Sequence, residues 1–258
     1  QVTSPEVAEI LGKPGVRCYV GFDPSASSLH VGNLLQVMTL VRMQRAGHRP
    51  IALAGGATGM IGDPSGKSEE RNLLDREQLA YNLESIQGQL ARFLDFSPGA
   101  TQAVMVNNHD WLGGVSFLGL LRDVGKRFSV NAMLEKESVR ARLEEREQGI
   151  SYTEFSYQIL QGMDYLELYR QYDCVLQTGG SDQWGNLTSG VDLIHRVEGA
   201  GVHAIGTPLI TNSDGTKFGK SEGNAIWLDA AMCSPYRMYQ FWLSSTDADV
   251  VDRLKVFT

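Results

Sequence analysis

The sequence predicts an α/β fold, in which helices cover both faces of a parallel sheet. Short apolar segments with strand-like composition recur along the 258 residues, and segments with helical periodicity separate them. Because neighbouring parallel strands need a long crossover, usually a helix, this alternation favours a parallel sheet over a series of hairpins. The composition, with 42% hydrophobic and 21% charged residues, supplies enough apolar side chains for one large core.

The first half of the chain contains strand–helix units in a regular order. Residues 17–23 form a short apolar run that ends at Pro24, which indicates a strand followed by a turn. The apolar side chains of the next segment have helical spacing, and Gly47 ends that helix. The further elements expected in this half are a strand at 50–54, a helix at 74–96 and a strand at 103–106.

The second half repeats the alternation after a helical, strongly charged stretch at about 109–149. The elements expected there are a helix at 153–172, a strand at 174–177, a helix at 184–197 and a strand at 204–210. We interpret the stretch at 109–149 as an insertion between the two halves of one Rossmann-like nucleotide-binding domain that spans residues 1–258.

Composition and charge disfavour several classes of function. The net charge of −7 argues against a dedicated nucleic-acid-binding surface, although it is compatible with a local basic patch. The three cysteines are far apart and the five histidines lack ligand spacing, so neither a disulfide framework nor a protein-bound metal is expected. Since no apolar run is long enough to span a bilayer, no membrane partner is expected. The expected compartment is a reducing one, a bacterial cytoplasm or an organelle matrix.

Two short segments carry residues suited to phosphate binding. In the first, SLHVGN at 28–33, His30 and Asn33 are three residues apart at the expected start of a helix. Residues with this spacing share a helix face, and unpaired backbone N–H groups lie beside them. The second, TKFGKS at 216–221, concentrates positive charge on a glycine-flanked stretch. Together the two segments predict a site for the phosphates of ATP.

The glycine-rich segment at 55–68, GGATGMIGDPSGKS, is neither a P-loop nor a dinucleotide fingerprint. A P-loop needs a glycine at the position where Ile61 stands, and no acidic residue follows at the dinucleotide spacing. What remains is a turn after a strand that places Asp63 at the carboxyl edge of the sheet, where ligands bind in open α/β folds. The alternative is an ordinary turn aspartate before a proline, and the surrounding glycines favour a binding role.

Polar side chains on the expected helix at 153–172 also form a candidate site. Tyr157, Gln161 and Asp164 fall within about 60° of one another at 3.6 residues per turn. Such a stripe is either a solvated helix face or a binding surface for a small polar ligand. Downstream, the segment GGSDQWGN at 179–186 follows a strand and opens a helix. Its residues either cap that helix or bring backbone and the Asp182 carboxylate close to a ribose.

Taken together, these residues resemble the class I tyrosyl-tRNA synthetases of bacterial or organellar type, over residues 16–258. The segment HVGN at 30–33 is similar to the His-Ile-Gly-His signature of that family, and KFGKS at 217–221 is similar to its Lys-Met-Ser-Lys-Ser signature. Asn33 replaces the second signature histidine and Ser25 replaces a frequent threonine; each keeps a hydrogen-bond donor. The segments that narrow the resemblance to tyrosine are 19–24, 55–64, 157–164 and 179–186.

The resemblance implies roles for the residues that match the family. The residues implied for L-tyrosine are Tyr19 and Asp164 on the phenol, Asp63, Tyr157 and Gln161 on the α-ammonium, and Gln183 on the carboxylate. Those implied for the phosphates are His30, Asn33, Ser25, Lys217 and Lys220, joined by Lys67 and Arg71. Those implied for the rest of ATP and the adenylate are Gly21, Asp23, Gly32, Gly180, Asp182 and Lys220.

The implied activity is the activation of L-tyrosine with ATP to tyrosyl-adenylate, followed by transfer to tRNA(Tyr). Mg²⁺ is expected on the ATP phosphates, with no prosthetic group. Residues 117–133 resemble the dimer-forming insertion of the family, so a homodimer is expected. The family's anticodon-binding and RNA-binding domains are expected to be absent from this chain. Transfer to tRNA is therefore expected to need those domains, whereas adenylate formation is not.

Two alternatives to this interpretation remain open. One is a tryptophan-specific relative, which Tyr19 and Asp164 disfavour because indole has no hydroxyl to bind. The other is a non-catalytic paralogue that binds RNA, which Lys217 and Lys220 disfavour because a binding protein has no need of phosphate-binding lysines beside a complete tyrosine pocket.

Overall fold

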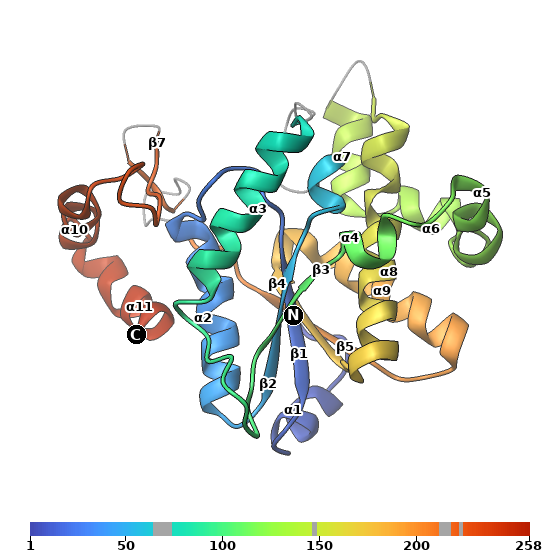
Figure 1. The fold of residues 1–258 in the computed structure, drawn as a ribbon, viewed down its shortest axis with the longest axis horizontal. Coiled ribbons are helices and arrows are strands. Elements are labelled where there is room, and N and C mark those ends of the chain that lie inside the picture. The colour runs from blue at the N-terminus through green and yellow to red at the C-terminus, as the bar shows by residue number, and fades with distance from the viewer. Residues whose placement is uncertain (64–73, 146–148, 212–217, 222–223) are drawn as a thin grey trace.

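A five-stranded parallel sheet forms the centre of the molecule (Figure 1). The computed structural model describes residues 1–63, 74–145, 149–211, 218–221 and 224–258. The strand order is β3-β2-β1-β4-β5, and every neighbouring pair is parallel. The strands are β1 (Arg17–Phe22), β2 (Arg49–Ala54), β3 (Val104–Asn107), β4 (Leu176–Gly180) and β5 (His203–Thr207). The predicted parallel α/β sheet is confirmed.

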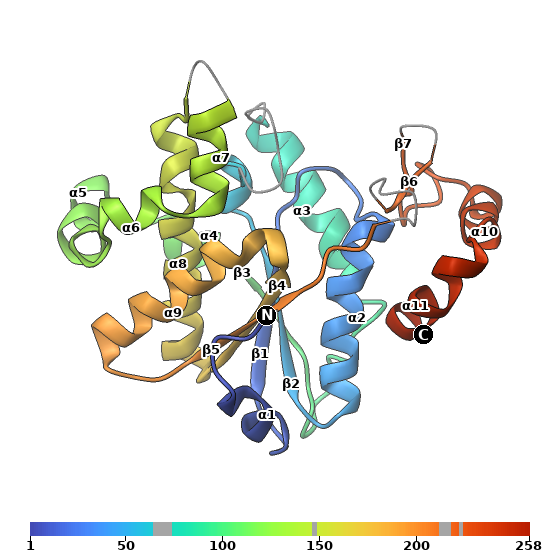
Figure 2. The ribbon, with the colours of Figure 1, turned by 180° about the vertical axis from the view of Figure 1, so that it is seen from behind.

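Helices cover both faces of this sheet, as Figures 1 and 2 show from opposite sides. On one face, α2 (Val31–Arg45) and α3 (Arg76–Leu90) share a buried apolar cluster with alternate side chains of β1. On the other face, α8 (Tyr152–Tyr172) and α9 (Trp184–Glu198) share a second cluster that contains Tyr19. Because side chains alternate along a strand, Tyr19 points toward α8 while its neighbours point toward α2.

The helix expected at 74–96 is shorter in the structure. α3 begins after Asp75, whose side chain accepts from the Gln78 backbone N–H at 2.8 Å, and it ends at Leu90. Residues 91–93 form turns instead, although Leu94 still packs into the cluster with α2. Apolar contact therefore continues beyond the helix. Because the apolar residues after Leu90 keep a helical spacing, the sequence predicted a helix longer than the real one.

The sheet opens between β1 and β4. Their ladder ends at the pair Tyr19↔Gln177, whereas β1 stays paired with β2 as far as Phe22↔Ala54. As a result Gly21 is exposed although it lies in the central strand. The chain moves outward from β1 to β3 on one side and from β4 to β5 on the other, so this gap is the topological switch point, where open α/β sheets bind ligands.

The remaining elements are short helices and a small hairpin. Between β3 and α8 the chain is mostly helical, and α5 and α6 extend away from the sheet in Figure 1. The elements there are α4 (His109–Leu112), α5 (Phe117–Gly119), η2 (Leu120–Val124), η3 (Gly125–Arg127), α6 (Val130–Leu134) and α7 (Glu137–Glu145). Elsewhere lie α1 (Glu6–Leu11), η1 (Thr58–Met60), η4 (Ser181–Gln183), β6 (Lys220–Ser221), β7 (Asn224–Ala225), α10 (Pro235–Leu243) and α11 (Asp247–Phe257). Within the described part of the chain, no helix has the length and hydropathy of a membrane span.

Candidate active site

Several of the residues expected to bind ligands gather where the carboxyl ends of β1 and β4 diverge. β1 contributes Tyr19 and Gly21, and β4 leads directly into η4 at the start of α9. α8 adds Asp164 from the face of the sheet to which Tyr19 points. Segments that are far apart in the sequence therefore form one site at the switch point.

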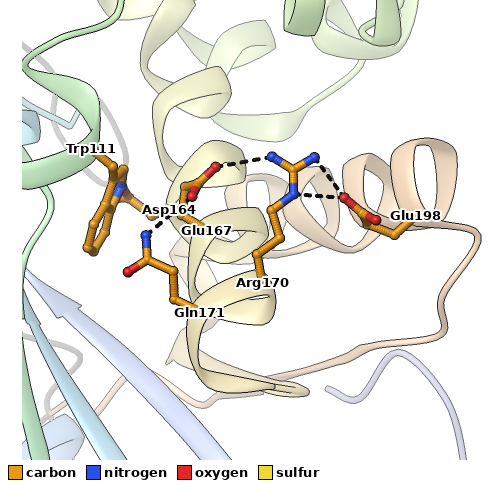
Figure 3. A network of polar contacts seen from close by, with 6 residues as sticks. All are labelled: Trp111, Asp164, Glu167, Arg170, Gln171 and Glu198. Carbon is orange, nitrogen blue, oxygen red and sulfur yellow. Dashed lines mark hydrogen bonds and ion pairs between the residues drawn. The ribbon is translucent and has the colours of Figure 1, made fainter.

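Asp164 is a buried carboxylate held by two donors. It is 2% exposed; its Oδ1 accepts from Trp111 Nε1 at 2.9 Å and its Oδ2 accepts from Asn108 Nδ2 at 3.0 Å. Figure 3 shows the Trp111 indole beside it. Burial raises the pKa of Asp164 to about 7, although both hydrogen bonds act to lower it. Each carboxylate oxygen keeps a lone pair, so Asp164 can still accept a hydrogen bond from a ligand hydroxyl.

Tyr19 presents a buried hydroxyl to the same place. It is 1% exposed, and its hydroxyl has no hydrogen-bond partner among the described residues. Its ring packs against Tyr165 with centroids 5.3 Å apart. Burial raises the pKa of Tyr19 well above its usual value, and the nearby Asp164 charge raises it further. An unpaired buried hydroxyl costs about 1–3 kcal/mol, which a ligand hydroxyl placed between these two residues would recover.

Tyr157 and Asp23 form a second polar pair at the end of β1. The Tyr157 hydroxyl donates to Asp23 Oδ2 at 2.7 Å, and the Thr58 hydroxyl donates to Asp23 Oδ1 at 2.7 Å. Since the only hydroxyl proton of Tyr157 points at Asp23, its oxygen offers lone pairs to a ligand. That arrangement suits a cation such as an ammonium group. It also places Asp23 beside residues expected to bind the amino acid, whereas the sequence grouped Asp23 with the nucleotide.

The polar stripe of α8 faces the interior. Tyr157 is 5% exposed and Asp164 is 2% exposed, while Gln161 between them is half-buried. The alternative of a solvated polar face is therefore wrong for this helix. Met163 and Leu166 on the other side of the helix are also buried. α8 is consequently enclosed on both sides, and its buried polar groups bond other elements: Tyr157 bonds Asp23, and Asp164 bonds Asn108 and Trp111.

Asp63 and Gln183 come together from the two sides of the switch point. Gln183 Nε2 donates to Asp63 Oδ2, and Asn186 Nδ2 donates to Gln183 Oε1 at 3.0 Å. Asp63 is 9% exposed and follows Gly62, whose φ of +85° forms the turn after η1. An amino acid carries its ammonium and carboxylate groups on one carbon. A carboxylate and an amide that touch each other are therefore a suitable pair to bind them.

Bare backbone flanks the opening between β1 and β4. Gly21 is exposed at the end of β1, and Gly180 ends β4. A Cβ on Gly180 would come within 2.3 Å of Asp182 Oδ1, so the Asp182 side chain in η4 lies directly against this glycine. Since neither Gly21 nor Gly180 carries a side chain, a sugar or phosphate can approach the peptide backbone closely at these positions. The nucleotide roles of Gly21, Gly180 and Asp182 remain predictions.

His30 and Asn33 begin α2 as a reciprocal cap. His30 Nδ1 accepts from the Gly32 N–H at 3.0 Å, and Asn33 Oδ1 accepts from the His30 N–H at 3.0 Å. His30 has extended backbone angles and lies before the helix, so it does not share a helix face with Asn33 as the spacing predicted. Because Nδ1 accepts, the hydrogen of a neutral His30 ring is on Nε2, where it can be donated to a phosphate oxygen. A Cβ on Gly32 would lie 2.7 Å from the His30 ring, so this cap needs a glycine there.

The two signature segments lie side by side. Gly219 has a φ of +83°, and a Cβ on it would lie 3.1 Å from the Gly32 nitrogen. The Ile226 N–H donates to the Gly219 carbonyl at 2.9 Å, and the Val31 N–H donates to the Ile226 carbonyl at 2.8 Å. Phe218 is buried in one cluster with Val31 and Ile226. The second signature is thus packed against the first turn of α2.

The structure describes only some of the residues expected at the phosphates. Lys67, Arg71 and Lys217 lie outside the described residues. For Lys220 the backbone is described, in β6, but not the side chain. Ser25 is exposed and its N–H donates to the Asp23 carbonyl at 2.8 Å, beside the amino-acid end. The phosphate roles of all these residues remain predictions.

Sequence reasoning missed Thr58, Asn108 and Trp111. Thr58 and Asn108 are 2% and 0% exposed, and they bond the carboxylates named above. Asn108 follows β3 directly, so the rule that singled out Asp63 at the carboxyl edge of the sheet would also have found it. Trp111 lies in the stretch that was interpreted as an insertion and therefore received no role.

The sequence profile described as tRNA synthetases class I (W and Y) matches residues 13–258. Among curated relatives, the tyrosine–tRNA ligase of Leifsonia xyli subsp. xyli is 61% identical over 259 residues, which cover all of this chain and 58% of the relative. That of Acidothermus cellulolyticus is 60% identical over 245 residues, covering 94% of this chain and 57% of the relative. The chain thus spans little more than half the length of the curated relatives it matches.

Solved structures agree with this relationship. A C-terminally truncated mitochondrial tyrosyl-tRNA synthetase from Aspergillus nidulans superposes with a TM-score of 0.83 at 31% identity, covering 94% of this chain and 71% of that one. A tyrosyl-tRNA synthetase from Archaeoglobus fulgidus, solved with L-tyrosine, shares the fold at a TM-score of 0.70 and 18% identity, covering 95% and 70%. The profile match over nearly the whole chain means that the chain belongs to the class I tRNA synthetases of the tryptophan and tyrosine group.

Proposed function

We propose that this chain is the catalytic part of a tyrosine–tRNA ligase and activates L-tyrosine with ATP. The observation that carries the proposal is the pair formed by Tyr19 and Asp164: an unpartnered buried hydroxyl beside a buried carboxylate. Such a pair binds a substrate hydroxyl; when that hydroxyl is missing, the buried Tyr19 hydroxyl stays without a partner and the Asp164 carboxylate lacks a third donor. The relatives named tyrosine–tRNA ligase support the same substrate.

In this proposal the amino acid lies across the switch point. Its phenol reaches Tyr19 and Asp164, and its ammonium group is bound by Tyr157 and Gln161 from α8. Asp63 adds a negative charge to the ammonium site. The carboxylate is oriented by Gln183, which already contacts Asp63. Residues on rigid elements hold both ends, which favours a single orientation of the substrate.

The chemical step is an in-line displacement at the α-phosphorus of ATP. A carboxylate oxygen of tyrosine forms the new bond to phosphorus, and the bond to the bridging oxygen of pyrophosphate breaks. His30 Nε2 and the positive end of the α2 dipole would stabilise the charge that develops on the leaving group, with Asn33 and Ser25 nearby. Additional positive charge would come from Lys217, Lys220, Lys67 and Arg71. Gly21, Gly32, Gly180, Asp182 and Asp23 would accommodate the rest of the nucleotide.

Mg²⁺ would enter the site as part of the ATP complex. Among the described residues, no group of three or more histidine, cysteine, aspartate or glutamate side chains is placed to hold a metal ion. The phosphate oxygens would supply ligands of the ion, as in other phosphoryl-transfer sites.

We further propose that the protein acts as a homodimer on tRNA(Tyr). Apolar side chains are exposed on the helices between β3 and α8, among them Phe117 (60%), Leu118 (78%) and Val130 (59%). Exposed apolar groups of this size support an isologous contact with a second copy. The variant Leu118→Glu should then be monomeric in sedimentation, whereas Leu209→Glu, which changes an exposed leucine outside these helices, should not alter the oligomeric state.

The names of the relatives bear on the compartment. The bacterial relatives favour a bacterial cytoplasm, and the mitochondrial one favours an organelle matrix.

Tyrosine-dependent ATP–pyrophosphate exchange tests the proposed activity. Exchange is expected with tyrosine and not with phenylalanine or tryptophan at equal concentration. Exchange with tryptophan instead would assign the protein to the other branch of the family. Tyrosine binding without exchange would support the non-catalytic alternative and contradict the proposal.

A further inference from the structure

An unbroken run of side-chain hydrogen bonds connects the two ends of the proposed tyrosine site. Thr58 lies at its centre, where it donates to Asp23 at 2.7 Å and accepts from Asn108 Nδ2 at 3.0 Å. Asp23 also accepts from Tyr157 at 2.7 Å, at the ammonium end. Asn108 also donates to Asp164 at 3.0 Å, at the phenol end. Thr58 touches neither proposed contact of the ligand, yet it joins the residues behind both.

The direction of each hydrogen bond in this run is fixed. Asn108 Oδ1 accepts from the Ala57 N–H at 2.8 Å, so its amide nitrogen faces Thr58 and Asp164. Because Asn108 donates to Thr58, the single hydroxyl proton of Thr58 is directed to Asp23. Thr58, Asn108 and Asp164 are each at most 2% exposed, which leaves no bulk water to replace a lost partner.

The backbone leaves room for this contact. A Cβ on Gly55 would lie 2.1 Å from Asp23 Oδ1 and 2.5 Å from Thr58 Oγ1. A side chain at that position would separate the two groups or displace them. The glycine at the end of β2 thus allows the carboxylate and the hydroxyl to meet.

We propose that Thr58 is a positioning residue that couples the ammonium end of the tyrosine site to the phenol end. The inference rests on the proposed function. Without the Thr58 hydroxyl, Asp23 loses a donor and Asn108 loses an acceptor, so the groups that orient Tyr157 and Asp164 lose their connection. The contribution of the ammonium end to tyrosine binding then no longer depends on how well the residues at the phenol end are ordered.

A double-mutant cycle measures this coupling. Tyr157→Phe removes the hydroxyl that donates to Asp23, and Trp111→Phe removes the N–H that donates to Asp164. The dissociation constant of tyrosine is measured for the wild type, both single variants and the double variant. The same four proteins are then made with Thr58→Val. With Thr58 present, the double loss should differ from the product of the single losses by at least about threefold; with valine, the losses should multiply to within about twofold.

Thr58→Ser is the matched control, because serine keeps the hydroxyl. It should retain the coupling and leave the KM for tyrosine within about twofold, whereas Thr58→Val should raise that KM roughly tenfold. If the valine variant fails to fold, Thr58→Ala, which also lacks the hydroxyl, takes its place. Coupling that persists without the hydroxyl, or a serine variant that behaves like valine, overturns the inference. Failure of the wild type to bind tyrosine overturns the proposed function and this inference together.

Discussion

The two ends of the candidate site are built on different physical principles. At the amino-acid end, Tyr19, Asp164 and Thr58 are almost fully buried; Thr58 donates to Asp23, and Asp164 accepts from Asn108. At the phosphate end, the groups around the start of α2 are half-buried or exposed side chains, such as His30 and Ser25.

Because of this difference, the two ends contribute differently to recognition of the substrates. A buried polar group that loses its partner costs the full desolvation penalty, so the amino-acid end can reject a ligand that lacks one hydroxyl. A phosphate chain carries several charges and is bound by any array of donors with the correct spacing, so the other end needs positive potential more than a fixed shape.

Removal of the Asp164 carboxylate should have the largest effect. In Asp164→Ala, the preference for tyrosine over phenylalanine in kcat/KM should fall about 100-fold, because a hydrogen bond to a buried charge is worth about 1.5–3 kcal/mol. Pyrophosphate exchange with both amino acids measures the ratio. Asp192→Asn, an exposed aspartate on α9, serves as the control and should leave the ratio unchanged. An unaltered preference in Asp164→Ala would show that the phenol binds elsewhere.

The pH dependence of stability should carry a contribution from Asp164. The folded protein keeps the Asp164 proton up to a pKa of about 7, whereas an unfolded aspartate loses it near pH 4. Folding therefore binds a proton between these values, and the free energy of unfolding should fall by about 1.4 kcal/mol for each pH unit in that window as the pH rises. Asp164→Asn cannot titrate and should lose this slope.

Urea unfolding at pH 5, 6 and 7 tests this directly, because the difference between wild type and Asp164→Asn cancels the other titrating groups. The stability advantage of the wild type should shrink as the pH rises. A constant difference over the three pH values would mean that Asp164 stays ionised in the fold. The affinity for tyrosine, unlike the stability, should increase as the pH rises through 7, since the ionised carboxylate is the better acceptor for the phenol.

At the phosphate end, the cap of α2 should contribute less. Asn33→Ala removes the acceptor for the His30 N–H and should lower the free energy of unfolding by about 1 kcal/mol. Asn33→Asp keeps the acceptor and should retain the stability, but its negative charge should weaken ATP binding. Thermal unfolding and the KM for ATP separate the two roles. If the aspartate variant binds ATP as tightly as the wild type, Asn33 lies away from the phosphates and acts only in the cap.

The sequence was sufficient to predict the sheet and the residues on regular elements, because hydrophobic periodicity identified the elements and a spacing of i, i+4 and i+7 aligned Tyr157 with Asp164. It could not reveal Thr58 as a bridge, since the partners of Thr58 are far away in the chain and meet it only after β1, β2 and β3 are side by side. It also misplaced His30, because whether a residue is the cap or the first helical residue depends on backbone angles that spacing does not specify.

The smallest effect is expected where charges remain exposed. Arg170 links Glu167 on its own helix to Glu198 on α9, at 3.2 and 2.7 Å, as Figure 3 shows. The Arg170 side chain is 45% exposed, so solvent screens both pairs, and Arg170→Met should change the free energy of unfolding by no more than about 0.5 kcal/mol. Urea unfolding at low and high salt measures it, and the tyrosine KM should not change. If Arg170→Met lowered the preference for tyrosine over phenylalanine as much as Asp164→Ala does, the contact between α8 and α9, and not the buried carboxylate, would hold the amino-acid end in place.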